Sequence, residues 1–177
     1  MAEPPREASH DATMVRIGQA VMLHRAGDRE EARNRLVQLW RETGSGALLH
    51  RCTIAHYLAG TQDDPRAELE WDRRALAAAE ALSAERAAQG GRAGELRTLY
   101  PSLHLRLAAD HWALGEVTAA HRELARARAL LGGLPHDAYG TGVRAAVLRL
   151  AERLGPVGEG PAPGPPPGPP PQGGRSG

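Results

Sequence analysis

The chain has 177 residues, of which 41% are apolar and 3% aromatic, and this length suffices for one domain-sized core. Its formal net charge of +1 excludes a general electrostatic attraction to nucleic acid or to an anionic membrane surface. The single cysteine, Cys52, excludes an internal disulfide and a zinc site built from several cysteines.

The N-terminal segment 1–10 is polar and contains prolines, and it lacks the apolar core of a secretory signal, so we predict that it is disordered. The first helix is expected from Ala12 to Arg25, with Asp11 as its N-cap. Gly27 follows as a helix stop, and Asp28 is placed to cap a second helix, with Glu31 completing a capping box. The very short loop predicts an antiparallel helical hairpin.

Two further hairpins and a final helix follow. The second hairpin is predicted from 46–60 and a helix that begins at Pro65 after the N-cap Asp64. The third is predicted from 101–115 and 116–133, and a last amphipathic helix, 138–154, has no partner after it and is typical of a terminal cap.

The segment 83–100 is predicted to be a longer connection with helical turns of its own. Pro101 either begins the next helix or kinks a longer helix that starts near Ala93, and the apolar spacing favours a kinked or interrupted helix.

The C-terminal segment 155–177 is almost entirely proline and glycine, so we predict a disordered tail, with a ligand for a proline-binding domain as the alternative. No run approaches the roughly 20 apolar residues of a membrane-spanning helix. The sequence therefore predicts a soluble cytoplasmic protein with one folded domain over 11–154.

The predicted hairpins repeat at a regular spacing. Gly27 and Gly60 are 33 residues apart, whereas Gly60 and Gly115 are 55 apart, because most of the surplus lies in 83–100. A small residue, a bulky residue and the turn glycine recur in each first helix, as Ala20/Leu23/Gly27, Thr53/His56/Gly60 and Ala108/His111/Gly115.

A period near 34 residues with two helices per unit resembles the tetratricopeptide repeat family. The early Trp, the Tyr and the closing Pro of that family's pattern are absent here, so the chain resembles a divergent member. The resemblance implies an all-α fold: a short right-handed α-solenoid of hairpins with about seven helices.

Few residues suggest a catalytic or metal-binding role. Cys52 and His56 are four residues apart and could share a metal ion or form a thiol–imidazole pair, but both lie at interior positions of the repeat, which favours a core role. The acidic residues Glu68, Glu70 and Asp72 are interpreted as solvent-facing charges that pair with neighbouring arginines. We therefore predict no catalytic residues, no cofactor and no metal site.

The family resemblance implies that the first helices line a concave groove. The candidate groove residues are His24, His50, Ile54, Tyr57, Arg106 and Trp112. Alternatively, the segment 83–100 or the terminal helix covers them. The predicted function is a non-catalytic protein-interaction or scaffold module that binds a peptide or helix of a partner protein. The alternative is a peptide- or ligand-sensing regulatory domain that acts on a separate regulator.

Overall fold

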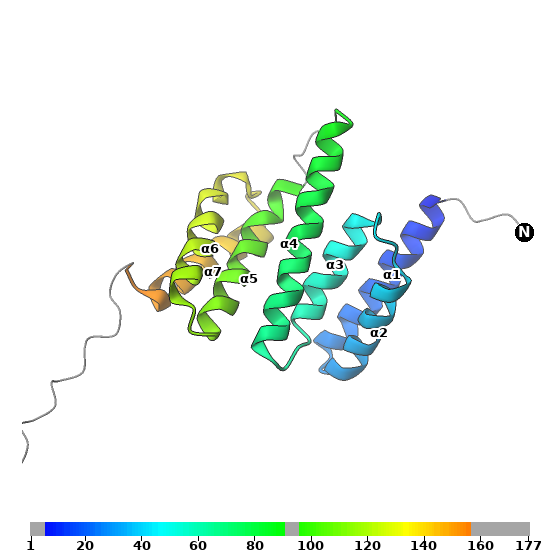
Figure 1. The fold of residues 1–177 in the computed structure, drawn as a ribbon, viewed down its shortest axis with the longest axis horizontal. Coiled ribbons are helices and arrows are strands. Elements are labelled where there is room, and N and C mark those ends of the chain that lie inside the picture. The colour runs from blue at the N-terminus through cyan, green and yellow to red at the C-terminus, as the bar shows by residue number, and fades with distance from the viewer. Residues whose placement is uncertain (1–5, 91–95, 157–177) are drawn as a thin grey trace, which may run out of the picture.

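The computed structural model describes residues 6–90 and 96–156, and every regular element within these ranges is helical (Figure 1). The predicted all-α class is therefore confirmed. No described helix is both long and apolar enough to cross a lipid bilayer. The described helices are α1 (Arg6–Arg25), α2 (Arg29–Glu42), α3 (Leu48–Ala59), α4 (Pro65–Ala88), α5 (Tyr100–Ala113), α6 (Val117–Ala129) and α7 (Ala138–Leu154), with short 3-10 helices at Leu96–Thr98 and Leu131–Gly133.

The helices pack as three hairpins side by side in chain order (Figure 1). Helix α1 packs against α2, α3 against α4, and α5 against α6. Neighbouring hairpins meet through α2 and α3 and through α4 and α5, and α1 also contacts α3. The last helix, α7, packs on α5 and α6, as expected of a helix that covers the end of the row.

The predicted helix ends depend on short-range chemistry, and most of them are confirmed. Asp28 accepts a hydrogen bond from the Glu31 N–H, and Asp64 accepts from the N–H groups of the first turn of α4. Gly27 has a φ of 93° and is in the left-handed region, where glycine is favoured. Gly60, by contrast, has a helical φ of −65°, because a longer loop follows it.

Three boundaries differ from the expectation. Helix α1 begins at Arg6, so Asp11 lies within the helix and the predicted start at Ala12 is wrong. Helix α4 continues to Ala88, into the predicted connection 83–100. Helix α5 begins at Tyr100, and Pro101 occupies its first turn, where a missing N–H breaks no helical hydrogen bond. The structure thus selects the first of the two alternatives for Pro101.

The remaining predicted segments are described only in part. Of the N-terminal segment 1–10, the described residues 6–10 are helical. Gly155 ends α7, and the predicted tail otherwise lies outside the described residues from 157 onward.

The apolar core forms three clusters along the row of hairpins. The first joins the first hairpin to α3 through Ile17, Ala20, Val21, Leu36, Leu39, Ile54 and Leu58. The middle cluster joins α3, α4 and α5 through Cys52, Ala55, Ala75, Ala78, Ala79 and Leu103. The last joins the third hairpin to α7 through Ala108, Leu124, Ala127, Leu134, Val143, Val147 and Leu150. The first hairpin is therefore held by the second, and the second and third hairpins each have a packed neighbour on both sides.

Candidate interaction surface and buried polar cluster

Residues from three successive hairpins meet beside Gly60, at the end of α3. A Cβ atom added to Gly60 would lie 3.8 Å from His24 Nε2 of α1, 4.0 Å from Arg106 Nη2 of α5 and 3.7 Å from the Tyr57 carbonyl oxygen. These are ordinary contact distances, so a small side chain fits at Gly60 and would contact all three groups. We call these four residues, His24, Tyr57, Gly60 and Arg106, the Gly60 junction.

The Gly60 junction contains three of the six predicted groove residues, and it offers both an aromatic ring and a cation. The Tyr57 ring is half-buried, packs against the first core cluster, and meets the His56 ring edge-on with centroids 5.2 Å apart. The Arg106 side chain is 30% exposed. Partly exposed aromatic and guanidinium side chains are enriched at protein-binding surfaces.

The other three candidates lie elsewhere. Ile54 is fully buried in the first core cluster and has no surface to offer a partner, so its prediction as a groove contact is wrong. Trp112 packs in the last core cluster, and the Arg153 guanidinium of α7 lies 4.2 Å from the centre of its ring. The terminal helix thus partly covers Trp112, as the alternative interpretation expected.

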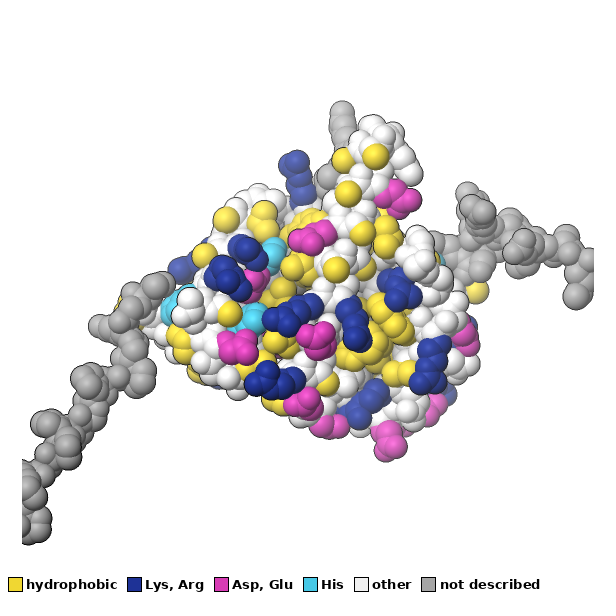
Figure 2. Space-filling model, viewed as in Figure 1, with side chains coloured by type: hydrophobic (Ala, Val, Ile, Leu, Met, Phe, Trp, Pro, Cys, Tyr) yellow, Lys and Arg dark blue, Asp and Glu magenta, His cyan; other side chains and the backbone are white. Residues whose placement is uncertain are grey.

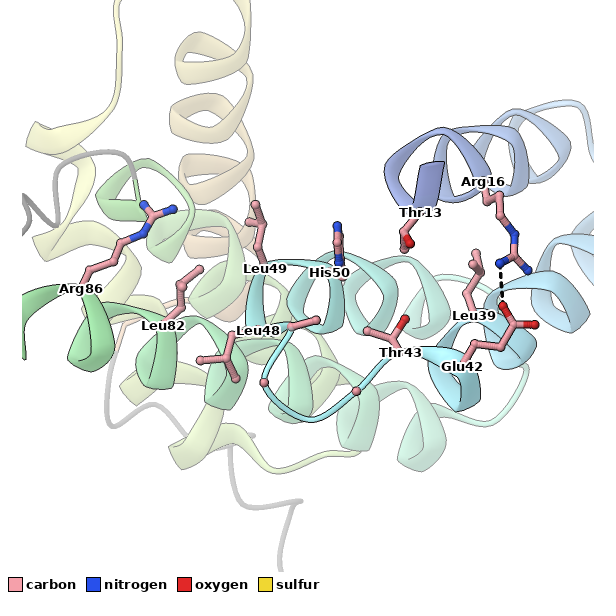
Figure 3. A pocket seen from close by; sticks show the side chains of 13 residues that line it. Thr13, Arg16, Leu39, Glu42, Thr43, Leu48, Leu49, His50, Leu82 and Arg86 are labelled. Atoms are coloured by element: carbon pink, nitrogen blue, oxygen red, sulfur yellow. Dashed lines mark hydrogen bonds and ion pairs between the residues drawn. The ribbon is translucent and has the colours of Figure 1, made fainter. Parts of the chain in front are cut away.

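His50 lies at the opposite end of α3 from Gly60 and lines a pocket of about 470 Å³ (Figure 3). The wall combines leucine side chains with an ion pair between Arg16 and Glu42 on one side and Arg86 on the other. The start of α1, the loop from α2 to α3 and the second half of α4 contribute to it. Its volume falls in the range of small-molecule sites.

Charges of both signs are mixed over the face seen in Figure 2, with apolar side chains between them. This agrees with the near-neutral net charge. The strongest electrostatic feature is instead buried, between α4 and α5.

The buried polar cluster consists of Glu68 and Asp72 on α4 and of Arg106 and Asp110 on α5. Arg106 Nε donates to both carboxylate oxygens of Asp72, at 3.0 and 2.9 Å. The same guanidinium donates from Nη2 to Glu68 Oε1 at 3.2 Å. Asp72 is only 1% exposed and Asp110 6% exposed. The cluster therefore places one cation among three carboxyl groups, of which Asp72 and Asp110 have little access to water whereas the Glu68 side chain is 36% exposed.

This environment alters proton affinities. Burial, with a smaller contribution from the neighbouring Asp72 carboxylate, raises the pKa of Asp110 to about 8. Burial also raises the pKa of Asp72, to about 6, although Arg106 opposes the shift. One oxygen of each of these two carboxyl groups lies within 4.8 Å of the other, so their ionisations are linked.

Sequence reasoning missed this cluster. Glu70 pairs with Arg73 at 3.0 Å on the solvent side, as expected, but the interpretation of Asp72 as a solvent-facing charge is wrong. The signal was its register, since Leu69, Asp72 and Ala75 share one buried stripe of α4. Asp110 follows Leu107 on the buried stripe of α5 in the same way.

Cys52 and His56 occupy different surroundings. The Cys52 thiol is buried in the middle core cluster, and burial raises its pKa to about 11, which opposes formation of a reactive thiolate. His56 is also shielded, and burial, with the nearby Arg106 charge, lowers its pKa to about 4. Both residues are therefore uncharged at neutral pH, in keeping with the predicted core role.

No protein-family model matches the chain, and neither a curated protein nor a solved structure matches it.

Proposed function

We propose that the chain is a tetratricopeptide-like, non-catalytic interaction module that binds a peptide or helix of another protein at the Gly60 junction. The carrying observation is the convergence of His24, Gly60 and Arg106 from three consecutive hairpins at one position. A ligand seated there contacts three separate repeats at once, which is how a stack of hairpins forms a continuous binding face.

The chemistry of the Gly60 junction suits a peptide. Tyr57 offers an aromatic surface already held by the first core cluster, so little side-chain entropy is lost on binding. The imidazole of His24 and the guanidinium of Arg106 provide polar contacts on either side. The right-handed superhelix and the cytoplasmic location belong to the same proposal.

The decisive experiment fills this position without disturbing the fold. Gly60 has a helical φ, so a Gly60→Leu variant has no backbone strain, and its Cβ meets no atom closer than 3.7 Å. We expect this variant to keep its helicity by circular dichroism and to lose at least tenfold in affinity for a partner peptide identified by crosslinking in the native cell.

The matched control is Gly132→Leu, in the 3-10 helix after α6, where an added Cβ meets nothing within 4 Å. It should bind as the wild type does. Equal affinity of the Gly60→Leu variant and the wild type would remove the Gly60 junction from the binding site.

The pocket at the start of α3 favours a second candidate, a small-ligand sensor that acts on a separate regulator. Its lining of leucines with flanking charged groups is typical of such sites. A compound found by thermal-shift screening should then lose affinity in Gly46→Trp, which places an indole at the pocket wall, and should keep it in Gly60→Leu. The opposite pattern assigns the compound to the Gly60 junction.

A further inference from the structure

The contact between the second and third hairpins combines apolar and polar groups. In the middle core cluster, the fully buried side chains of α4 are those of Ala75, Ala78 and Ala79, and Trp71 and Leu76 pack against the cluster as partly buried residues. The three alanines bury little area and make few dispersion contacts. The polar cluster beside them is therefore a second contribution that holds α4 and α5 together.

A bound proton reduces the excess of negative charge in the polar cluster. With Glu68, Asp72 and Asp110 all ionised, three negative charges would face the single positive charge of Arg106, with one oxygen of each carboxyl group within 4.8 Å of the others. Like charges at that separation in a buried site repel strongly. Asp110 Oδ2 is buried and has no hydrogen-bond donor among the described residues, so ionisation of Asp110 would leave it uncompensated.

The other charged or titratable groups near the polar cluster do not add the positive charge that would neutralise the second and third carboxylates. On α3, His56 is held neutral by burial and by Arg106. On α1, His24 approaches Arg106 only across Gly60. On α5, His104 turns toward α6, where its Nδ1 lies 2.8 Å from Glu123 Oε2.

We propose that the boundary between α4 and α5 is a proton-controlled hinge. A proton shared by Asp110 and Asp72 holds the second and third hairpins together, and its loss loosens their contact. Because Arg106 belongs to both the polar cluster and the Gly60 junction, loosening also alters the binding face proposed above. The hinge itself does not depend on that function.

The direction of the pH effect on the contact between α4 and α5 follows from the raised pKa of Asp110. The pKa of Asp110, about 8, lies above the ordinary value of 3.8, so the shared proton stabilises the folded junction fully only below about pH 3.8. The stabilisation decreases as pH rises from 3.8 and is lost as pH passes through about 8. The expected opening is therefore on the alkaline side.

The chain contains a reporter for this opening, because Cys52 is buried in the middle core cluster between α3, α4 and α5. The experiment measures the rate at which Ellman's reagent labels Cys52 from pH 6 to 9, in the wild type and in Asp110→Asn. The amide of Asn is a neutral donor that cannot ionise, and it mimics the protonated acid. The ratio of the two rates at each pH cancels the common dependence on thiolate formation.

We expect the ratio of wild-type to Asp110→Asn rates to rise at least tenfold between pH 6 and pH 9. The exposed carboxylate of Asp63, which pairs with Arg29 and Arg33, provides the control variant Asp63→Asn, which should follow the wild type at every pH. A ratio that stays constant across the range would overturn the proposal.

An independent measurement covers the case in which Asp110→Asn fails to fold. Infrared spectroscopy of the wild type should show the C=O stretch of a protonated carboxylic acid at pH 7, and this band should vanish above pH 9 while the protein remains helical. Absence of the band at pH 7 would contradict the shared proton directly.

Discussion

Arg106 contributes to two features of the structure. It neutralises a buried carboxylate, and it borders the position of Gly60. Its Nε holds both oxygens of Asp72, and its Nη2 reaches Glu68 and the space above Gly60. A guanidinium suits this role, because its separate N–H donors can bond two carboxylates at once and it remains charged when partly buried.

We therefore expect Arg106→Gln to destabilise the protein by about 2 kcal/mol or more, since it leaves Asp72 buried without its cation. The 30% exposure of the arginine side chain keeps the loss toward the lower end of the range for buried pairs. The measurement is urea unfolding at pH 7. Arg73→Gln, which breaks an exposed pair with Glu70, should cost less than about 0.5 kcal/mol, and equal costs would contradict the assignment.

His56 should make the free energy of unfolding decrease as pH falls, whereas Asp110 should make it decrease as pH rises. Its pKa of about 4 lies below the ordinary 6.5, so the unfolded chain binds a proton more readily between these values. Stability should fall as pH drops from 6.5 toward 4. In urea unfolding at pH 7 and 4.5, the wild type should lose about 2 kcal/mol relative to His56→Gln.

The control for this measurement is His136→Gln, at an exposed position between α6 and α7. It should show the same change with pH as the wild type. If His56→Gln also follows the wild type, the imidazole of His56 is protonated without penalty in the folded protein.

At the residue scale, the sequence predicted helix caps better than it predicted buried charges. Asp28 and Asp64 were identified because an N-cap depends only on its own turn. The pairing of Asp72 with Arg106 joins residues 34 apart, across two helices whose register the sequence alone does not define. His24, the Tyr57 carbonyl oxygen and Arg106 lie beside Gly60, whereas the buried Ile54 shows that the repeat spacing cannot distinguish groove from core.

At the scale of the elements, some glycines end helices, whereas another allows two parts of the backbone to lie close together. Gly140 lies in the first turn of α7, and its N–H donates to the N-cap Asp137 at 2.8 Å. A Cβ at this position would lie 1.9 Å from the Pro135 carbonyl oxygen, far inside contact distance. The conformation of the chain before α7 therefore requires a residue without a side chain at Gly140.

Two alanine substitutions in α7 should have opposite effects. Gly140→Ala should destabilise the protein by about 2 kcal/mol, because the backbone at Pro135 must move. Gly142→Ala should stabilise it by about 0.5–1 kcal/mol, since its Cβ meets nothing within 4 Å and alanine is the better helix former. Thermal unfolding of both variants provides the test, and a shift of the same sign in both would contradict this account.

Element boundaries were less predictable than element types. Periodic apolar residues identified all seven described α-helices, but α1 and α4 extend beyond their predicted ends. Residues such as Ala87 and Ala88 propagate a helix wherever nothing stops it, and the sequence places no capping signal before Gln89. Pro101 was ambiguous because proline is compatible with a helix start and with a kink.

For the molecule as a whole, the row of hairpins has a consequence for stability. The first hairpin packs chiefly within itself and on α3, and the third packs within itself and on α4 and α7. Free energy in such a row is approximately a sum of terms for each hairpin and each neighbouring contact. A local defect should therefore loosen its own hairpin and the next one, and leave the far end unchanged.

Leu36 on α2 and Leu124 on α6 test this prediction. Each is buried, and each lies four residues after an alanine of the same helix. Replacing either with alanine should cost about 2–5 kcal/mol locally. By hydrogen–deuterium exchange, Leu36→Ala should speed exchange in α1 to α4 and spare α6 and α7. Leu124→Ala should do the reverse, sparing α1 and α2. Uniform acceleration across all helices in both variants would show instead that the hairpins unfold as one cooperative unit, and the proton-controlled boundary between α4 and α5 could not then move independently of the rest.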